Sequence, residues 1–472
     1  PTSWEAPHAT LTANVLGTLN LLEAVRRYAP AARFQFSGSS EEYGRVESGE
    51  CPITENQPLR PLSPYGVSKV AADLLVRQYA ASYGLHVVVT RAFNHSISGE
   101  MPVLVRRREN GLINILPIED ICKKRAKCAD EAWKVSEYDI WDGAQFTPIV
   151  GMSAHFVRED KNIHTVAAHA GVVKCTSTHS LLDADYQPFA AKEATPGKHL
   201  AIGGFPTCPA ATAVSEGLAY FYGAMAAEGC VTGGKVRFDN KDREFLDKIE
   251  KLYVSNFGGY VQRSLDRVSG VGRLVLAGVP SLAASLDRNL YTRGREKRVP
   301  VVILNADEAA QNAFLDGFNR GDGLTAPSYS PKRMHRQYTT KSPTLAMGLF
   351  YLVQSALKAR CSVSYEDRNA GYYNICINST DKDKKNWGAN LEKADALVKK
   401  NIVRHKPGAA VYDFETQSHH FMAGAGRVVV HNTGPRRGHV FAESNWARQL
   451  ALIERGEQEP FIAHGNLDAV RD

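Results

Sequence analysis

The chain has 472 residues, of which 43% are apolar and 23% charged, with a net charge of +7 and an isoelectric point near 8.9. This length suits about three domains of roughly 150 residues each. No apolar run approaches the roughly 20 residues of a membrane span, so we expect no membrane partner. The eight cysteines form no Cys-x-x-Cys pair, which excludes a disulfide framework or zinc ribbon and favours the cytoplasm. The mildly basic charge permits nucleic-acid binding without requiring it.

Residues 1–95 alternate helical and strand patterns. Apolar periodicity and β-branched runs predict a helix over 9–28, a strand over 32–37 and a parallel strand over 86–90. Ser39 and Glu41 follow the first strand, at the kind of strand end where doubly wound sheets bind ligands.

Tyr65 opens a second predicted helix, and Lys69 lies four residues on, so the phenol and the ammonium share one face. A nearby ammonium is expected to lower the pKa of Tyr65 and make it a base. Tyr-x-x-x-Lys alone is a weak signal, because such pairs are common on solvated helices.

The joint pattern is more specific. Ser39, Glu41, Tyr65 and Lys69, with Asn-Val-Leu-Gly-Thr at 14–18 and Arg-Ala-Phe-Asn at 91–94, resemble extended short-chain dehydrogenases, nearest GDP-mannose 4,6-dehydratases. The resemblance implies a Rossmann-like α/β fold with a doubly wound parallel sheet. It also implies that Tyr65 and Lys69 engage the nicotinamide ribose of NAD or NADP and the catalytic proton.

In the same family pattern, Ser39 would hydrogen-bond the sugar O4, Glu41 would be the acid/base of water elimination, and Asn94 would contact the phosphates of a GDP-mannose-like nucleotide sugar. A related GDP-sugar reductase or epimerase is the alternative. The family's glycine-rich loop should precede Pro1 and most of its substrate domain should follow Asp472. We therefore expect a fragment that does not hold NAD(P) alone, of a host that is a homo-oligomer when complete.

The segment 96–432 is far longer than an ordinary loop and must contain domains of its own. Its first part, 96–200, reads as short strands, placed at 103–105, 112–116, 165–167 and 172–174. Thr176 and His179 follow the last of them as Thr-x-x-His. As an isolated motif this pair is uninformative, since a Thr and a His three apart more often lie on a solvated turn.

The middle part, 201–400, reads as helical and contains a degenerate repeat, 218–229 and 313–323. Each copy has small residues four apart and an acid at the helix end, Glu228 or Asp322. Carboxylates at the negative ends of two adjoining helix dipoles repel each other unless a cation lies between them, so we expect Mg²⁺ at this pair. The alternative is a purely structural role, in which these are two packed helices that each end in a glycine C-cap.

The repeat resembles the dodecapeptides of LAGLIDADG homing endonucleases. This implies an α+β domain in which Glu228 and Asp322 bind Mg²⁺ and cut double-stranded DNA at the uninterrupted host-gene site. Lys297, in Lys-Arg-Val-Pro, matches the family's active-site lysine. Basic residues that suit phosphate contacts flank the second copy, although basic runs are usually only solvated faces: Arg288, Arg293, Arg295, Arg298, Lys332, Arg333, His335, Arg336 and Lys341.

The last part, 401–432, predicts strands at 411–416, 419–423 and 428–430, and ends in His431, Asn432 and then Thr433. An Asn can cyclise on its own carbonyl and cut the chain after itself when a neighbouring acid protonates the leaving amine, and His431 is placed to do so.

A hydroxyl residue, Ser96, at one end and His-Asn before Thr433 at the other resemble the splice junctions of an intein. This implies an all-β Hint splicing domain formed by 96–200 and 401–432. Thr176 and His179 would hydrogen-bond the scissile 95–96 peptide, and Asp413 and His419, rather than the adjacent His420, would assist the branch step. Splicing would need no cofactor.

Deleting 96–432 joins Thr-Arg-Ala-Phe-Asn-His to Thr-Gly-Pro-Arg-Arg-Gly, which reads as one continuous segment of the dehydratase family, with the host resuming over 433–472. The leading hypothesis is thus a multi-domain precursor whose insert excises itself and ligates His95 to Thr433. The rival is a stable, unspliced protein whose insert is only a DNA-binding or structural domain.

Overall fold

The computed structural model describes residues 2–44, 56–92, 96–121, 131–133, 135, 137–157, 162–324, 336–359, 361–367, 371–377 and 395–431. Asn94, Asn432, Thr433 and the predicted host segment 433–472 lie outside these ranges. The chain divides into two compact units, one of 1–95 with 158–160 and 435–472, the other of 96–157 with 161–434. No helix in the described ranges is both long and apolar enough to cross a membrane.

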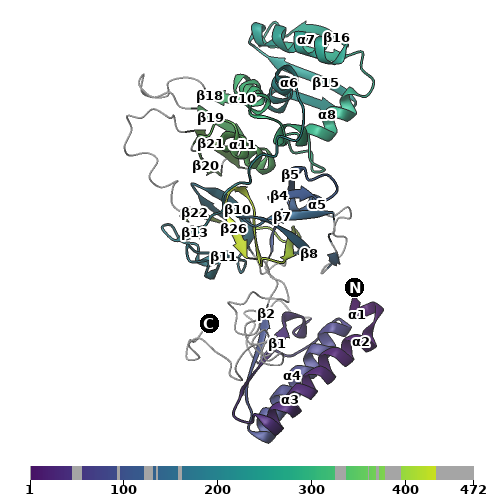
Figure 1. Ribbon diagram of the computed structural model, residues 1–472, viewed down its shortest axis with the longest axis vertical. Coiled ribbons are helices and arrows are strands. Elements are labelled where there is room, and N and C mark those ends of the chain that lie inside the picture. Colours follow the sequence, from purple (N-terminus) through teal and green to yellow (C-terminus); the bar gives the residue numbers. More distant parts are fainter. Residues whose placement is uncertain are drawn as a thin grey trace. The chain divides into compact units, whose positions relative to one another are not determined.

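The first unit contains a β–α–β arrangement (Figure 1). Strands β1 and β2 pair in parallel, and helix α4 connects them, as expected for a parallel crossover. Ser63 caps α4 by accepting a hydrogen bond from the N–H of Gly66, and Gly84 ends the helix with φ of 67°. The elements are α1 (Thr2–Glu5), α2 (Pro7–Leu11), the π-helical η1 (Thr12–Leu16), α3 (Gly17–Tyr28), β1 (Arg33–Ser39), the 3₁₀ η2 (Ser40–Glu42), α4 (Pro64–Tyr83) and β2 (His86–Ala92).

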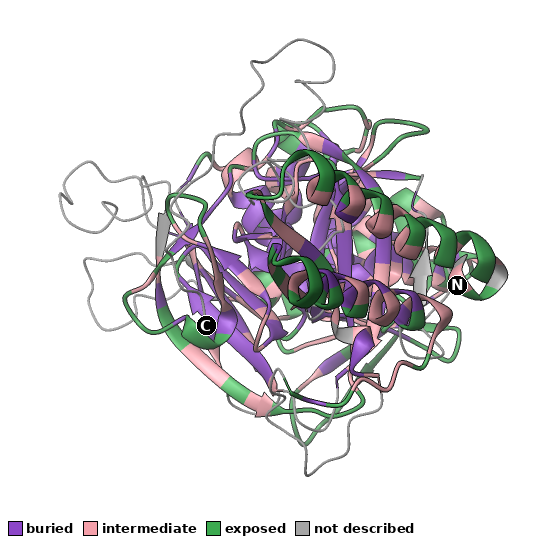
Figure 2. Cartoon of the chain, turned by 90° about the horizontal axis from the view of Figure 1, so that it is seen from below, coloured by how far each residue is buried: buried purple, intermediate pink, exposed green. Residues whose placement is uncertain are grey.

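Both predicted helices and both predicted strands of this unit are confirmed, and so is the parallel pairing, although the helix predicted over 9–28 is divided into the end of α2, the π-helical η1 and α3. The doubly wound sheet is not completed by the described residues, because over 2–92 the sheet has two strands. The core is correspondingly small and is centred on Leu22, Phe36 and Val76. Figure 2 shows mostly exposed and intermediate residues along these N-terminal helices.

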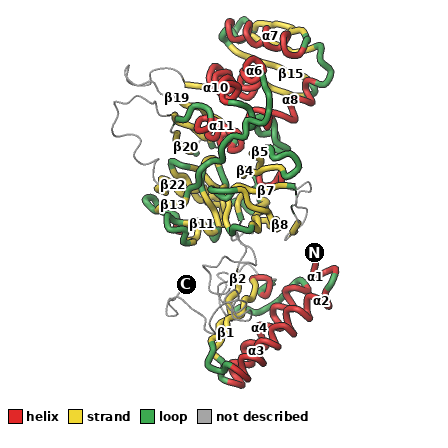
Figure 3. Tube along the Cα trace, in the orientation of Figure 1, coloured by secondary structure: helices red, strands yellow, loops and turns green. Residues whose placement is uncertain are grey.

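The described part of the second unit begins and ends in strands, and Figure 3 shows strands gathered below the helices of its central region. These belong to a 12-stranded sheet and a 4-stranded sheet of order β12-β11-β26-β24. The N-terminal elements are β3 (Ile97–Ser98), β4 (Pro102–Arg107), β5 (Ile113–Pro117), α5 (Ile118–Ile121), β6 (Glu131–Trp133), β7 (Tyr138–Trp141), β8 (Phe146–Phe156), β9 (Asn162–Ala168), β10 (Gly171–Thr176), β11 (Ser180–Leu182), β12 (Pro188–Ala190), the 3₁₀ η4 (Ala191–Glu193) and β13 (His199–Ala201). The C-terminal ones are β22 (Asp395–His405), β23 (Ala410–Thr416), β24 (His420–Met422), β25 (Ala425–Gly426) and β26 (Val429–His431).

Two stretches of chain, β10 followed by β11 and β23 followed by β24, run from the large sheet into the small one. In the large sheet β10 and β23 flank β3, and in the small sheet their continuations β11 and β24 flank β26. The first strand of the segment 96–431 and its last strand are therefore held between the same two stretches of chain. The sheet also takes in β22, which starts at Asp395, whereas the sequence predicts that the closing part starts at 401.

Between these strands lie two copies of one α-β-β-α-β-β arrangement. The first has strand order β14-β15-β17-β16 and the second β18-β19-β21-β20, so equivalent strands take equivalent places. The elements are α6 (Glu216–Ala227), β14 (Gly229–Thr232), β15 (Lys235–Asn240), α7 (Arg243–Phe257), β16 (Tyr260–Leu265), β17 (Gly272–Ala277), α8 (Leu282–Leu290), α9 (Val301–Leu304), α10 (Glu308–Asp322), β18 (Gly323–Leu324), β19 (Arg336–Thr340), α11 (Pro343–Ser355), β20 (Cys361–Glu366) and β21 (Tyr372–Ile377).

The sequence description of 201–400 as helical is thus wrong in part, and the region is α+β. Its strands are short, and several alternate buried and exposed residues, as in β15 and β17. This alternation is a weaker sequence signal than the strongly apolar helices α6 and α11.

One hydrophobic core runs from the flanking strands into this central region. Leu104, Val172 and Met422 of the flanking strands belong to the same buried cluster as Phe314 and Leu349. The completely buried Asn305 adds two hydrogen bonds to Ile113: its Oδ1 accepts from the N–H at 2.8 Å and its Nδ2 donates to the C=O at 2.7 Å. The two regions of the second unit therefore fold as one body.

Candidate functional site

Ser96 is buried, with 1% of its surface exposed, and lies beside the turn that carries Thr176. The N–H of Thr176 donates to the Ser96 C=O at 2.9 Å, and its Oγ1 lies 3.3 Å from both the N and the O of Ser96. On the other side of β3, Ile97 pairs with Tyr412, so the next step of the antiparallel register brings Asp413 opposite Ser96. Three residues that the sequence singled out therefore converge on one point.

The turn 176–179 joins the two sheets. The N–H of His179 donates to the Thr176 C=O at 2.9 Å, and the His179 side chain is completely buried. Leu181, two residues on, pairs with Val430, and one further register step brings His431 beside the start of β11. Only residues 177–179 separate the strand end beside Ser96 from the strand start beside His431.

His419 and His420 take different places. His419 lies in the turn before β24 with φ of 64°, in the left-handed region, and its N–H donates to the Thr416 C=O at 3.2 Å. His420 lies within β24 directly opposite His431, and burial lowers its pKa. Its ring meets Tyr186 edge-on at 5.6 Å between centroids. Asp413 is buried and accepts from the N–H of Phe414 at 2.9 Å.

The paired acids form a second site, at the ends of α6 and α10. The helices approach closely through glycine: a Cβ on Gly223 would lie 2.0 Å from the Phe314 carbonyl oxygen, and one on Gly317 would lie 2.1 Å from that of Tyr220. Gly323, which follows Asp322, has φ of −91°. The predicted small-residue face is therefore present. Gly323 is the C-cap of α10, as the packing alternative predicts, but its backbone is extended and not left-handed, whereas the C-cap of α6 is Glu228 and not Gly229.

Glu228, Asp322 and Lys297 lie together at this point. Burial raises the pKa of Glu228, the charge of Asp322 raises it further, and Lys297 opposes both effects. Burial also raises the pKa of Asp322, again opposed by Lys297. Lys297 Nζ donates to the Ala227 C=O at 2.6 Å, and Asn240 Nδ2 donates to Glu228 Oε1 at 3.0 Å. Lys297 therefore does not fully compensate the negative charge of the two carboxylates, and the pKa values of both stay raised.

A cavity of about 460 Å³ opens beside this site, lined by Asp322, Lys297, Lys341 and Tyr372 among others. The described residues hold no cluster of three or more His, Cys, Asp and Glu side chains suited to a metal. Two mutually repelling carboxylates, of a partly buried Glu228 and an exposed Asp322, nonetheless fit Mg²⁺, which is commonly held by one or two carboxylates and completes its shell with water and substrate phosphate oxygens.

The predicted basic residues take different positions. Arg298 donates to the carbonyls of Arg288 (2.7 Å) and Asn289 (3.3 Å), and Arg295 pairs with Asp287, so these two arginines support the local fold. Lys341 lines the cavity with its Nζ 5.1 Å from the Tyr372 ring centre. Lys332, Arg333 and His335 lie outside the described residues, as does the Arg336 side chain.

In the first unit, Ser39, Glu41, Tyr65 and Lys69 meet at the end of β1. Ser63 Oγ donates to Glu41 Oε2 at 2.6 Å, and the Glu41 N–H donates to Ser39 Oγ at 3.2 Å. The expected lowering of the Tyr65 pKa is wrong for this arrangement: burial and Glu41 raise it. The reason is that Lys69 Nζ lies 5.8 Å from the Tyr65 ring centre and donates to the Ser37 C=O at 2.9 Å.

A buried ionic network next to these residues was not predicted. Arg91 bonds Glu42 at 2.7 Å and Asp73 at 2.9 Å, and both carboxylates are completely buried. It ties the end of β2 to α4 and η2. Asp73 on the inner face of the helix is the one sequence signal that could have indicated it, because a buried acid requires a partner.

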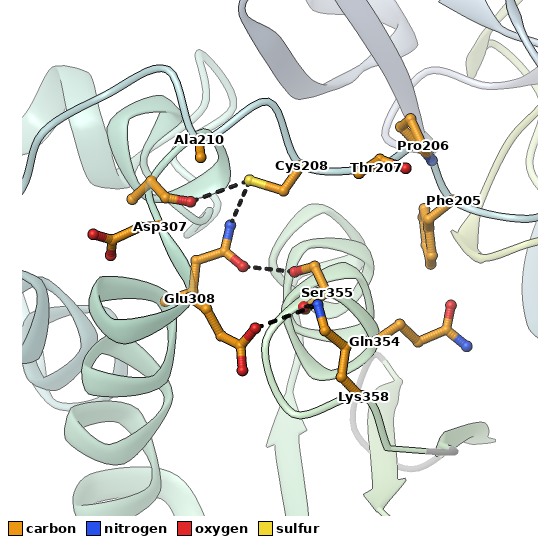
Figure 4. A pocket seen from close by; sticks show the side chains of 12 residues that line it. Phe205, Pro206, Thr207, Cys208, Ala210, Asp307, Glu308, Gln354, Ser355 and Lys358 are labelled. Carbon is orange, nitrogen blue, oxygen red and sulfur yellow. Dashed lines mark hydrogen bonds and ion pairs between the residues drawn. The ribbon is translucent and has the colours of Figure 1, made fainter.

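A further cavity, of about 400 Å³, lies between residues 205–210 and the ends of α10 and α11 (Figure 4). Cys208 Sγ donates to the Ala306 C=O at 3.1 Å and accepts from Gln311 Nε2 at 3.2 Å. Ser355 Oγ donates to Gln311 Oε1 at 2.7 Å. None of the predicted site residues lines this cavity.

The β–α–β fold with Ser39, Tyr65 and Lys69 at the strand end defines the N-terminal region as similar to nucleotide-sugar dehydratases and reductases. Residues 1–111 match the family model described as GDP-mannose 4,6 dehydratase. The GDP-6-deoxy-D-mannose reductase of Pseudomonas aeruginosa is 39% identical over 100 residues, which are 21% of this chain and 33% of that protein. The GDP-mannose 4,6-dehydratase of Vibrio cholerae is 37% identical over 116 residues, 24% of this chain and 31% of that protein.

A solved structure of RMD from Pseudomonas aeruginosa complexed with NADPH is 38% identical, with a TM-score of 0.20, over 21% of this chain and 34% of that one. A DNA polymerase of Acanthamoeba polyphaga mimivirus is 28% identical over 367 residues, which are 72% of this chain but 20% of the polymerase. The chain thus spans a third or less of the length of these curated relatives.

Proposed function

We propose that this chain is a nucleotide-sugar dehydratase-type host interrupted by a self-splicing insert, residues 96–432. The observation that carries the proposal is the position of Thr176. Its hydroxyl lies 3.3 Å from the Ser96 nitrogen, which is the nitrogen of the peptide bond that splicing breaks first. A hydroxyl at this bond can hold it for attack, and we assign the protonation of its nitrogen to the buried imidazole of His179, three residues beyond Thr176.

The steps balance without an outside reactant. Ser96 Oγ attacks the His95 carbonyl carbon, the C–N bond breaks, and the proton passes from Oγ to the new amine. Thr433 Oγ then attacks the resulting ester and releases Ser96 Oγ. Asn432 Nδ2 attacks its own carbonyl and frees the Thr433 amine, to which His431 supplies the proton. That amine takes the acyl group from oxygen, which leaves a His95–Thr433 peptide bond.

The polymerase match supports an insert that is separate from its host. The segments outside 96–432, residues 1–95 and 433–472, make up less than a third of the chain. A match over 72% of the chain must therefore include more than half of the insert. Residues 1–111, in contrast, match a sugar-nucleotide enzyme family. A module found with two unrelated neighbours is expected of a mobile insert.

Expression of the whole chain followed by intact mass measurement tests the proposal. Splicing predicts two species, the free insert and a ligated product of residues 1–95 and 433–472. Substituting Asn432→Ala must block release of the downstream piece. A single uncut species from the parent chain would instead favour the rival, an unspliced protein with a structural insert.

A second function, site-specific cleavage of double-stranded DNA, is favoured by the convergence of Glu228, Asp322 and Lys297 at the closest approach of α6 and α10. We assign Mg²⁺ to the two acids, where it would stabilise the negative charge that develops on a phosphodiester. Lys297 would supply a positive charge at the same phosphate, and Lys341, which lines the adjacent cavity, would contact the backbone of bound DNA. Incubation with Mg²⁺ and a plasmid that spans the uninterrupted host-gene site tests this assignment, and intact plasmid would contradict it.

For the host we assign the family roles as follows. Tyr65 and Lys69 would serve the nicotinamide ribose of NAD or NADP and the catalytic proton, Ser39 the sugar O4 and Glu41 the elimination, with Asn94 at the phosphates of a GDP-mannose-like substrate. The meeting of Ser39, Glu41, Tyr65 and Lys69 at one strand end supports this assignment. Dehydration of GDP-mannose by the complete ligated host, compared with Glu41→Gln, is the test.

A further inference from the structure

The turn that carries Thr176 and His179 is held from outside by the 3₁₀ segment η4. The N–H of Ala191 donates to the His179 C=O and the N–H of Lys192 donates to the Ser177 C=O, both at 2.9 Å. Ala191 is completely buried. The backbone of η4 therefore fixes both ends of the turn, and any shift of Ala191 would move His179.

Ala191 is in turn held by a side chain from a distant part of the sequence. Asn401, on β22, donates from Nδ2 to the Ala191 C=O at 2.9 Å, and its Oδ1 lies 3.0 Å from Nδ1 of His164, on β9. Because the amide directs its donor at a carbonyl, its oxygen must face His164, so the imidazole carries a proton on Nδ1 and donates it. This bond fixes the orientation of the amide.

His164 is well placed to act as an anchor. It is 6% exposed and lies directly opposite Cys175, next to Thr176, in the pairing of β9 with β10. The series His164, Asn401, Ala191 and His179 thus starts and ends beside the same strand end. These residues lie on the β9 side of β10, and β3 pairs with the opposite side of β10.

We propose that Asn401, oriented by His164, is a positioning residue for the first step of splicing, the attack of Ser96 on the 95–96 peptide; this inference rests on the function proposed above. Neither side chain touches the reacting bond. They act through Ala191 on the placement of His179, and an acyl shift depends steeply on such placement. Release at Asn432 depends instead on His431, which β24 and β11 flank.

The test measures the two cleavages separately in the full chain. In an Asn432→Ala background, hydroxylamine releases residues 1–95 at a rate that reports formation of the ester, whether it is still on Ser96 or has passed to Thr433. In a Ser96→Ala background, release of the downstream piece reports Asn432 cyclisation. Loss of one buried hydrogen bond predicts that Asn401→Ala slows the first rate roughly five- to twentyfold and leaves the second within about twofold.

Substitutions of His164 supply the matched control. His164→Asn keeps a donor near the position of Nδ1 and should preserve the hydroxylamine rate, whereas His164→Leu should slow it as much as Asn401→Ala does. Unchanged hydroxylamine cleavage in Asn401→Ala would overturn the proposal, and equal slowing of both cleavages would show a general structural role and overturn it too. If the Asn432→Ala parent gives no hydroxylamine product, the proposed function itself fails, and this inference with it.

Discussion

The two candidate sites of the segment 96–431 are assembled in different ways. At the proposed splice site, β3 and β26, from the two ends of the segment, are each held between the strands that run from one sheet into the other. At the acid site, two copies of one arrangement meet through glycines that let the backbones touch. The first site exists only because the ends of the segment return to one place. The second depends on an internal repeat and is independent of those ends, so the two chemistries should be separable by mutation.

The largest expected effect is at the splice junction. Ser96→Ala removes the attacking oxygen and should reduce ligation by on the order of 10³-fold or more, while DNA cleavage stays at the parent rate. Ligated product, followed by intact mass, is the measurement. Ser98→Ala, at a buried position two residues further along in β3, is the matched control, and ligation by Ser96→Ala at the control rate would contradict the assignment.

The complementary change is at the paired acids. Asp322→Asn should reduce plasmid cleavage by roughly 10²- to 10³-fold and leave splicing unchanged, whereas Asp316→Asn, on the same helix, should alter neither. Because burial raises the pKa of both Glu228 and Asp322, fewer are ionised as the pH falls. Parent cleavage should therefore decline on acidification at a higher pH than an exposed carboxylate would set. Plasmid cleavage by Asp322→Asn at the parent rate would contradict the assignment of DNA cleavage to the paired acids.

A third substitution tests the close packing of α6 against α10, on which the acid site depends. Gly317→Val forces side-chain atoms against the Tyr220 carbonyl and should lower the free energy of unfolding of the second unit by about 2–3 kcal/mol. Gly294→Ala, where the nearest atoms lie 3.7 Å away, is the control. Denaturant unfolding in the Asn432→Ala background measures both. Equal midpoints would show that the helices are not in close contact.

The smallest effect concerns Glu296, whose pKa is raised to about 7 by burial and then by Glu100. A folded-state pKa above the unfolded value means that stability falls as the pH rises from about 4.5 to 7. Glu296→Gln should therefore stabilise the second unit by about 1–2 kcal/mol at pH 8 and by almost nothing at pH 5. Glu308→Gln, at an exposed position, is the matched control and should not stabilise the unit at pH 8, because it removes no buried charge. The same gain at both pH values would contradict the burial of this charge.

Local sequence patterns correctly predicted individual strands and helix faces. The strands around Thr176 and Asp413, and the small-residue faces of α6 and α10, are present because apolar periodicity and glycine spacing are local properties. The sequence did not reveal the meeting of Asn401 with Ala191, the network around Arg91, or the register that brings His420 opposite His431. Each of these depends on how distant strands pair, which side-chain pattern alone does not determine.

The pKa of Tyr65 shows a different limit. Helical spacing correctly placed Tyr65 and Lys69 on one helix, yet the direction of the shift depends on desolvation and on Glu41, neither of which spacing reports. Motif spacing can indicate which groups are near one another, but the local electrostatics require the packed surroundings.

The hydrophobic core common to the flanking strands and the central repeat has an evolutionary consequence. Leu104 and Val172 belong to the same hydrophobic core as Phe314 and Leu349. Removing the repeat would therefore expose a large apolar surface to water. Loss of the acids costs no such exposure. If the acids cut DNA as proposed, a lineage that no longer gains from this activity is therefore expected to lose the carboxylates long before it loses the helices that carry them, and the repeat would persist as support for the flanking strands.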